Sequence, residues 1–355
     1  MSEKSVHLPQ ELVVEILLRL PVKTVLRCKC VCKSWLSLIS NPHFATSHFQ
    51  LAATPPTERL ICLETFSNET ISIDFNASFN DDSSYSSPSL DFLSGVRRPK
   101  IRGSCRGFLL LQYGTNFCIW NPSTGVHRQI PESLMASLST DYFSRTLCGF
   151  AYEPSADDYL VVLGSNNYNV SYDSLIYVEV FSLKANKWKL IVGGSHFPCR
   201  ISIDRLGLLL NNVIHWLVYN HETERYVISA FDLQEMRMSE IALPYCFDVS
   251  YISLIEYDLL VLGGLISALN MEKYTVEVWV LKDYADHSSW TKTLTLSMDS
   301  YFFPVCFTNC GNIIGTDGEG RLLKFNDKLQ LLEHQFYCDI YFNRSHLVLY
   351  RESLL

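Results

Sequence analysis

Five segments of this chain share one order of features: an aromatic-bearing strand, a polar turn and a second strand. Their aromatic markers are spaced by 61, 50, 48 and 46 residues. The markers are Trp120, Phe181, Phe231, Trp279 and Phe325. A four-stranded β-propeller blade occupies about 40–50 residues. The repeat therefore predicts an all-β, β-propeller-like domain of about six blades, with a β-sandwich-like array as the alternative.

Strand patterns also occur at both ends of the repeat region. Apolar and polar residues alternate in segments 59–66, 177–183, 226–233 and 275–281, which is the period of a half-buried strand. Strands around Ile61 and around 347–350 lie outside the five segments. We expect them to share one sheet, so that the two ends of the domain close it together.

Residues 8–49 follow the pattern of short helices instead. Apolar residues from Leu12 to Leu20, with Ile16 and Leu17 between them, recur at three- and four-residue steps, and Pro21 ends this helix. Two further helices are expected, with Val22, Val25, Leu26 and Cys30 inward in one, and Trp35, Leu36 and Ile39 inward in the other. The pattern predicts a helical module at 1–50, a linker at 51–58 and the β domain at 59–355.

Charge differs between these parts. Residues 1–50 carry six basic and three acidic side chains, a net charge of +3. The remaining residues carry 23 basic and 34 acidic side chains, a net charge of −11, and the whole chain has a net charge of −8. An acidic body argues against nucleic acid as the partner. The N-terminus lacks the apolar segment of a secretory signal, so we expect reduced cysteines and a place in the cytoplasm or nucleus. The longest apolar run, 259–269, is too short to span a membrane.

No residue pattern indicates catalysis, a cofactor or a metal. On a continuous helix Cys28 and Cys32 would share one face while Cys30 points away, and no nearby His or Cys completes a tetrahedral set. No Gly-x-Ser-x-Gly motif supplies a hydrolase nucleophile. Loops 77–90 and 164–172 are candidate substrate contacts, with no single residue assigned.

The helical module holds more apolar residues than a segment of about 40 residues buries alone. The β domain or a partner must cover the surplus. Arg19, Lys23 and Arg27 would then form a basic rim beside it, which suits an acidic partner.

The segment LPQELVVEILLRLPVKTVLRCKCVCKSWLSLISNPHF, which begins at Leu8, resembles the F-box. The β domain resembles the F-box-associated domain of plant F-box proteins, a kelch-like fold. That resemblance is carried by GSCRGFL from Gly103, WNPSTG from Trp120, CGFAY from Cys148, DYLVV from Asp158, VEVFSL from Val178 and NNVIHWL from Asn211. Together the two matches span about residues 8–350.

The resemblance implies a non-catalytic specificity subunit of an SCF-type cullin-RING ubiquitin ligase. Its F-box would dock on a Skp-type adaptor, and its β domain would bind a protein to be ubiquitinated. The adaptor-binding residues implied by the motif are Leu8, Pro9, Ile16, Leu17, Leu20, Pro21, Val22, Leu26, Val31, Cys32 and Trp35. Two alternatives remain: an S-locus-type F-box protein that recognises a ribonuclease, and a propeller enzyme or sugar binder that carries an F-box.

Overall fold

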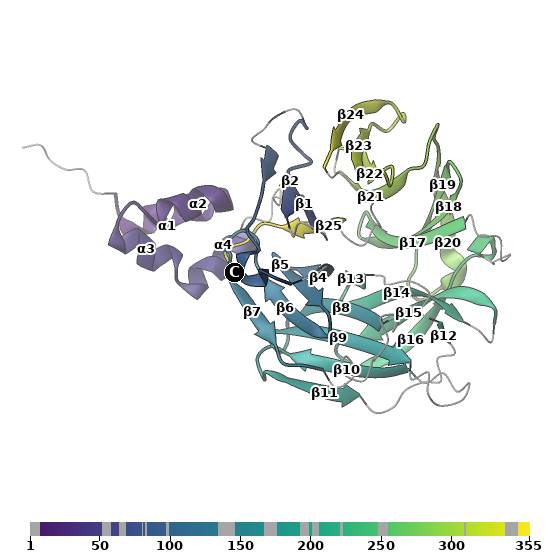
Figure 1. The fold of residues 1–355 in the computed structure, drawn as a ribbon, viewed down its shortest axis with the longest axis horizontal. Helices are drawn as coiled ribbons and strands as arrows, with labels where there is room; N and C mark the ends of the chain where they lie inside the picture. The colour runs from purple at the N-terminus through teal and green to yellow at the C-terminus, as the bar shows by residue number, and fades with distance from the viewer. Residues whose placement is uncertain are drawn as a thin grey trace, which may run out of the picture.

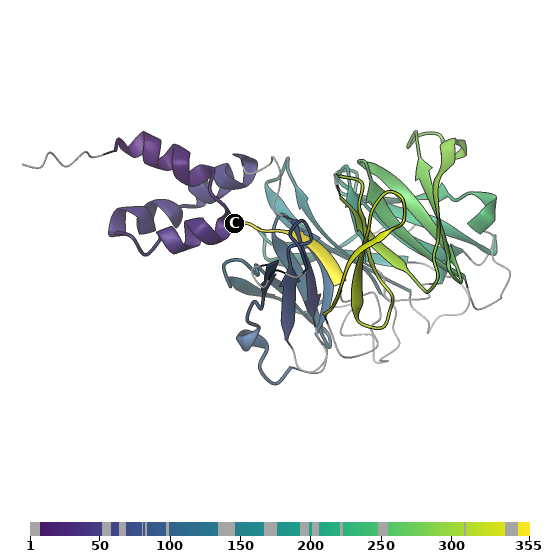
Figure 2. The ribbon, with the colours of Figure 1, turned by 90° about the horizontal axis from the view of Figure 1, so that it is seen from above.

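The structure is a computed structural model that describes residues 8–51, 58–63, 69–79, 81, 84–96, 99–133, 146–166, 176–191, 199–200, 206–220, 223–247, 255–308, 310–337 and 347–355. In these residues it shows a module of four helices and six β-sheets arranged as the blades of a propeller (Figure 1). The helical module projects from one side of the propeller, and the C-terminus lies where the two parts meet (Figures 1 and 2).

Prolines set the boundaries of the helices. Helix α1 (Gln10–Leu18) follows Pro9, and α2 (Val22–Cys28) follows Pro21. The first turn of a helix leaves its N–H groups without helical partners, so the missing N–H of proline costs nothing there. Helix α3 (Lys33–Ile39) is followed by a fourth helix, α4 (Pro42–Leu51), which begins at a proline.

The helices pack around a small apolar core. It contains Leu17, Leu18, Val22, Val25, Ile39, Phe44, Ala45 and, from the other end of the chain, Leu354. The imidazole of His48 on α4 is buried, and its Nε2 lies 2.8 Å from the carbonyl oxygen of Leu20. This hydrogen bond ties α4 to the connection between α1 and α2. Burial lowers the pKa of His48.

Blade 1 joins the two ends of the β domain. Its strands lie in the order β25 (Leu347–Arg351), β1 (Glu58–Leu63), β2 (Thr70–Ile73) and β3 (Tyr85–Ser86). Ile61 of β1 is paired with Val348 of β25 in an antiparallel ladder. The predicted closure by both ends of the domain is confirmed. This ladder therefore ties the first and last strands of the propeller together.

The other five blades follow one another along the chain. Blade 2 comprises β4 (Lys100–Cys105), β5 (Phe108–Tyr113), β6 (Asn116–Trp120) and β7 (His127–Ile130). Blade 3 comprises β8 (Thr146–Glu153), β9 (Asp158–Asn166), β10 (Ile176–Ser182) and β11 (Lys187–Ile191). Blade 4 comprises β12 (Cys199–Arg200), β13 (Leu208–Leu210), β14 (Val213–Asn220), β15 (Arg225–Asp232) and β16 (Arg237–Ala242).

Blades 5 and 6 complete the propeller. Blade 5 comprises β17 (Ile255–Leu262), β18 (Leu265–Glu272), β19 (Thr275–Leu281) and β20 (Trp290–Ser297). Blade 6 comprises β21 (Phe303–Phe307), β22 (Ile313–Thr316), β23 (Arg321–Phe325) and β24 (Leu331–Phe336). The predicted six-bladed propeller is confirmed, and the sandwich alternative is wrong.

The five aromatic markers occupy equivalent positions. Each lies on the strand next to the outermost one of its blade, namely β6, β10, β15, β19 and β23. All except the half-buried Trp279 are buried. A large ring at this position packs between neighbouring sheets, so the aromatic repeat marks the blades directly.

Apolar side chains fill each gap between neighbouring blades. Six clusters of buried residues lie one between each successive pair, from blades 1 and 2 round to blades 6 and 1. Blades 3 and 4, for example, meet through Val162, Val180, Trp216 and Phe231. The propeller core is therefore a ring of interfaces rather than one central core.

The antiparallel strands give the propeller two ends. In blade 2 the turn after β4, at Arg106 and Gly107, and the turn after β6, at 121–126, both lie beside the helical module. We call this the near end. Because successive strands reverse direction, the turn from the second to the third strand of a blade, and the connection to the next blade, lie at the opposite, far end.

Candidate docking surface of the helical module

The structure divides the predicted adaptor-binding residues by exposure. Leu8, Pro9, Ile16, Pro21, Val31 and Cys32 are exposed, and Leu20, Leu26 and Trp35 are half-buried. Val31 leaves 63% of its surface open, whereas Leu17 and Val22 leave 1% and 3%. Those two residues belong to the core of the module. A partner cannot reach them unless the helices separate.

Two further apolar residues are exposed that the sequence interpretation did not place on this surface. Leu12 is 50% exposed and lies four residues before Ile16 on α1. Residues four apart lie on the same helical face. The four-residue spacing between Leu12 and Ile16 was the signal that could have identified Leu12.

Leu36 is the second of these residues, and its expected inward position was wrong. It is exposed, whereas Trp35, Leu38 and Ile39 pack on the core of the module. Steps of three and four residues define that inward face of α3, so Leu36 points away from it.

The three cysteines do not lie on one helix. Helix α2 ends at Cys28, and Cys32 is the extended residue that precedes α3, with φ −161°. Cys30 lies in the turn between them and is exposed, so its expected inward position was wrong. The chain leaves the helix here, so helical periodicity no longer determines which side chains point inward. Cys30, Val31 and Cys32 thus extend the exposed surface beyond α2.

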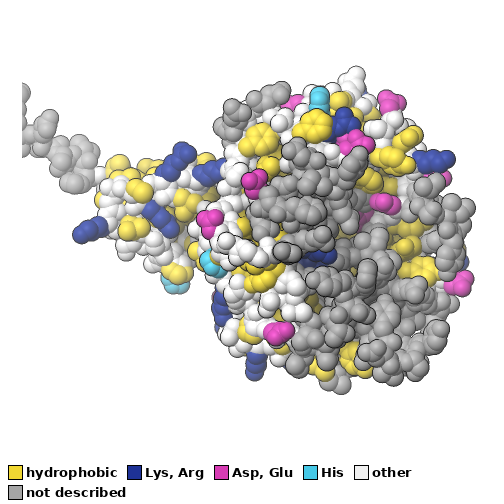
Figure 3. Space-filling model, viewed as in Figure 1, with side chains coloured by type: hydrophobic (Ala, Val, Ile, Leu, Met, Phe, Trp, Pro, Cys, Tyr) yellow, Lys and Arg dark blue, Asp and Glu magenta, His cyan; other side chains and the backbone are white. Residues whose placement is uncertain are grey.

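The basic side chains beside this surface are partly engaged within the chain. Arg19 forms an ion pair with Glu15 one turn earlier, and Lys23 Nζ lies 4.0 Å from Glu352 Oε1. Arg27 is exposed. Figure 3 shows hydrophobic and Lys or Arg side chains side by side on the helical module. The basic rim predicted from the sequence is therefore strongest at Arg27.

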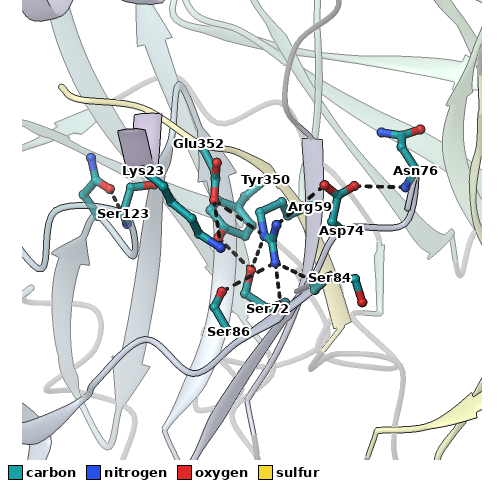
Figure 4. Close-up of polar contacts among 11 residues, drawn as sticks. Lys23, Arg59, Ser72, Asp74, Asn76, Ser84, Ser86, Ser123, Tyr350 and Glu352 are labelled. Carbon is teal, nitrogen blue, oxygen red and sulfur yellow. Dashed lines mark hydrogen bonds and ion pairs between the residues drawn. The ribbon is translucent and has the colours of Figure 1, made fainter. Parts of the chain in front are cut away.

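A buried polar network joins the helical module to blade 1 (Figure 4). Arg59 is 3% exposed, and its guanidinium donates to Ser72 Oγ at 2.7 Å and to the carbonyl oxygens of Ser72 and Ser84 at 3.0 and 2.7 Å. Its Nε lies 3.6 Å from Glu352 Oε1, which Lys23 of α2 approaches from the other side. Burial raises the pKa of Glu352, while Arg59 and Lys23 oppose this shift.

The C-terminal tail, residues 352–355, lies between the two parts. Asn121 of blade 2 is fully buried, and its Nδ2 donates to the main-chain oxygens of Ser353 and Leu355 at 3.2 and 2.8 Å. Leu354 enters the core of the helical module. The tail is thus held by the propeller at one side and by the helices at the other.

Two arginines hold α4 against the near end. Arg351 Nη2 donates to the carbonyl oxygen of Phe49, a residue 302 positions earlier, at 2.6 Å. The guanidinium carbons of Arg351 and Arg106 lie 4.1 and 5.0 Å from the centre of the Phe49 ring. Such cation–π contacts add about 0.5–2 kcal/mol each. The module is therefore fixed to the propeller at several independent points.

Comparisons with known proteins match both the helical module and the β domain to known families. Residues 6–46 match the F-box domain, and residues 59–337 match the F-box associated beta propeller domain. The chain belongs to this F-box-associated β-propeller family. It is 28% identical over 305 residues to F-box/kelch-repeat protein At3g23880, 29% over 314 to F-box protein CPR1 and 26% over 355 to F-box protein At5g49610, all of Arabidopsis thaliana. The alignments cover 82, 81 and 94% of this chain and 79, 73 and 92% of those proteins.

The F-box-associated motifs quoted above are structural in this propeller. A Cβ at Gly103 would lie 2.8 Å from Phe150 Cβ, and one at Gly149 would lie 2.8 Å from the Ile214 side chain. Neighbouring blades approach closely at both positions, which only glycine permits. The WNPSTG motif supplies Asn121, which binds the C-terminal tail. These motifs therefore build the blade contacts and the junction with the F-box.

The structure describes part of only the first of the two loops suggested as substrate contacts, apart from the start of the second at the end of β9. Phe79 of the first loop, and Phe75 just before it, are buried between blades 1 and 6. Lys324 Nζ donates to the carbonyl oxygens of Phe75 and Ala77 at 3.2 and 3.4 Å. This part of the loop is anchored at the near end. Residues 80, 82 and 83 of that loop, and 167–172 of the second, lie outside the described residues.

A groove of about 430 Å³ lies between blades 3 and 4 at the near end. Two of its carboxylates serve the turns that carry them: Glu153 accepts from the N–H groups of Ser155 and Ala156, and Asp158 from that of Lys184. Across the described part of the chain, no three His, Cys, Asp or Glu side chains are grouped to hold a metal. In the same residues no helix is long and apolar enough to span a membrane.

Proposed function

We propose that this F-box protein is the substrate-recognition subunit of an SCF-type cullin-RING ubiquitin ligase. The F-box would bind a Skp-type adaptor, and the propeller would bind a protein that the ligase ubiquitinates. The observation that carries the proposal is the surface of five exposed, large apolar side chains on a module of four helices: Leu8, Leu12, Ile16, Val31 and Leu36. Small soluble modules rarely leave so many such residues together without a partner.

The proposed adaptor contact combines the exposed and half-buried residues of the module. It consists of Leu8, Pro9, Leu12, Ile16, Leu20, Pro21, Leu26, Val31, Cys32, Trp35 and Leu36. Leu17 and Val22 act from the core, where they hold α1 and α2 in position. Truncation of a buried central anchor of a protein interface costs about 2 kcal/mol or more.

In this role the chain performs no chemistry of its own. It would raise the local concentration of a substrate beside the ligase enzymes, an effect that depends on a suitable distance and orientation. The junction formed by Arg59, Glu352, Asn121 and the C-terminal tail supports this role, because it holds the F-box against the propeller. We place the protein in the cytoplasm or nucleus, where such ligases act.

Binding to a purified Skp-type adaptor tests the proposal. Wild-type chain is compared with Leu12→Ala/Ile16→Ala, which shortens two exposed side chains of α1. The matched control is Leu331→Ala/Leu332→Ala, which shortens two exposed side chains of β24. We expect the α1 variant to lose at least about thirtyfold in affinity and the control to bind like the wild type.

Thermal unfolding of all three proteins accompanies the binding measurement. The residues changed are exposed, so similar unfolding midpoints are expected. If folded wild-type protein does not bind the adaptor, or if the α1 variant binds as tightly as the control, the proposed function is wrong.

A further inference from the structure

Exposed aromatic side chains are unevenly distributed over the propeller. Among the described residues six Tyr or Phe side chains are exposed: Tyr177, Tyr245, Tyr274, Tyr284, Tyr301 and Phe336. Five lie at the far end, at the start of β10, after β16, between β18 and β19, between β20 and β21, and at the end of β24. Tyr284, after β19, lies at the near end. Exposed aromatic rings therefore gather on the end that faces away from the F-box.

On blades 5 and 6 these rings form a continuous surface. The rings of Tyr274 and Tyr301 meet edge to face with centres 5.2 Å apart, and Tyr301 stacks on Phe303 at 6.5 Å. The turn between β22 and β23 packs against Phe303, since a Cβ at Gly318 would lie 3.0 Å from its ring. We call the surface formed by Tyr274, Tyr301, Phe303 and Phe336 the far-end aromatic surface.

A fixed arginine connects Phe336 to the rest. The guanidinium carbon of Arg321 lies 5.8 Å from the centre of the Phe336 ring. Arg321 is also paired with the buried carboxylate of Asp317 and, at 3.7 Å, with Glu319. Asp317 in turn accepts from the N–H groups of Glu319 and Arg321 at 2.8 and 3.1 Å. The turn is thereby rigid, and the charge of Arg321 is balanced by its own neighbours.

The charged groups around the rings are mainly acidic. The acidic side chains are Glu272, Asp299, Asp317 and Glu319, and the basic ones are Lys273 and Arg321, which gives −4 + 2 = −2. Glu272, Asp299 and Glu319 are exposed. Residues 51–355 carry the same sign, with 23 basic and 34 acidic side chains. The surface therefore attracts cations both locally and at longer range.

We propose that the far-end aromatic surface binds a substrate segment in which Lys or Arg residues stand beside apolar ones. The rings offer apolar contact area and negative faces for ammonium or guanidinium groups, and the three exposed carboxylates pair with the same cations. Tyrosine is also among the residues that most often dominate protein interfaces. The inference rests on the proposed function, because it names the class of substrate that the ligase subunit would capture.

The location also suits a substrate receptor. The F-box contacts the near end through Arg106, Asn121 and the C-terminal tail, so a partner at the far end leaves these contacts intact. Adaptor and substrate can then occupy the chain at the same time.

Two fluorescein-labelled peptides of 12 residues test the proposal by fluorescence anisotropy on the full chain. One alternates Lys or Arg with Leu, and the other carries Glu in place of each basic residue. We expect the basic peptide to bind and the acidic one not to bind. Raising the NaCl concentration from 50 to 300 mM should weaken the binding several-fold, because the carboxylates are exposed.

Substitutions test whether the basic peptide binds at the far-end aromatic surface. Tyr274→Ala/Tyr301→Ala should weaken binding of the basic peptide at least about tenfold, and Asp299→Lys/Glu319→Lys should weaken it similarly. Tyr245→Ala is the matched control: this tyrosine is 81% exposed at the same end but lies outside the surface, and its loss should leave binding unchanged. All variants are first checked for the wild-type unfolding midpoint.

Three results would overturn the inference. In the first, the basic peptide fails to bind folded wild-type protein, or binds the Tyr274→Ala/Tyr301→Ala variant as well as the wild type. In the second, the acidic peptide binds equally. In the third, light scattering shows a wild-type dimer that this variant lacks, so that the surface serves a second copy of the chain. Adaptor binding is measured on the same samples, so failure of the proposed function is recognised separately.

Discussion

Adding a methyl group at Gly107 should detach the C-terminal tail from the propeller. Gly107 lies in the turn between β4 and β5 with φ +89°. A Cβ there would lie 2.2 Å from Ser353 Oγ and 2.9 Å from the carbonyl oxygen of Arg351. Both distances are below 3.0 Å, which Cβ atoms essentially never show, so something must move. Because the turn is held by the β4–β5 ladder, the tail is the part expected to move.

The expected loss follows from the contacts of the tail. The left-handed backbone at Gly107 costs an alanine about 1–2 kcal/mol. Displacement of the tail also removes the hydrogen bonds from Asn121 Nδ2 to Ser353 and Leu355, together about 2 kcal/mol. Leu354 leaves the core of the F-box, which costs about 2 kcal/mol more. The Gly107→Ala variant should therefore be less stable by about 5 kcal/mol.

Gly125→Ala is the matched control. Gly125 lies in the β6–β7 turn of the same blade and has φ +76°. A Cβ added there would have no other atom within 4 Å. This variant carries the backbone cost alone, so the two variants should differ by about 4 kcal/mol. Calorimetry would show this as a difference of several degrees in unfolding midpoint. Hydrogen exchange should accelerate in the tail and in α1 and α2 only for Gly107→Ala.

A double variant tests the mechanism. Two of the three nearest atoms belong to the Ser353 side chain, so Gly107→Ala/Ser353→Gly should recover part of the lost stability. Equal unfolding midpoints and equal exchange for Gly107→Ala and Gly125→Ala would refute the reasoning. That result would mean that the tail does not hold the F-box to the propeller.

Three further outcomes follow from the junction and the core. Arg59→Met should lower the free energy of unfolding by about 3–5 kcal/mol in urea, because Glu352 loses its buried partner. Arg59→Lys should not restore it, since a single nitrogen cannot replace both Nε, which donates to Ser72 Oγ and faces Glu352, and Nη2, which donates to the Ser84 carbonyl oxygen. Leu354→Ala should cost about 2–3 kcal/mol and speed exchange in α1 and α2, while exchange in blade 4 stays unchanged. Burial lowers the pKa of His215 to about 4, so between pH 6.5 and 4 the unfolded chain binds a proton that the folded chain does not. The free energy of unfolding should therefore fall by on the order of 3 kcal/mol over this range. His215→Gln should flatten this pH dependence, and an unchanged pH dependence in that variant would contradict the prediction.

The sequence by itself determined the class of each part. The aromatic repeat located the blades because each large ring marks the same strand of a blade, and the surplus strands near Ile61 and 347–350 predicted the closure. Pro21 marked the end of the first helix, because the proline ring cannot continue a helix. These features depend on local spacing, which a single sequence displays.

Only the tertiary structure decided which apolar side chains of the F-box face outward. Leu12 and Leu17 belong to the same apolar pattern, yet one is exposed and the other buried, because α4 and Leu354 cover one side of the helix bundle. The junction between the F-box and the propeller could not be predicted from the sequence either, since Arg59, Glu352 and Asn121 make contacts between distant parts of the chain. The same holds for the far-end aromatic surface, whose rings come from two blades. Local periodicity reports the conformation of a segment, whereas these contacts depend on how whole segments pack, and that decides where the chain can meet its partners.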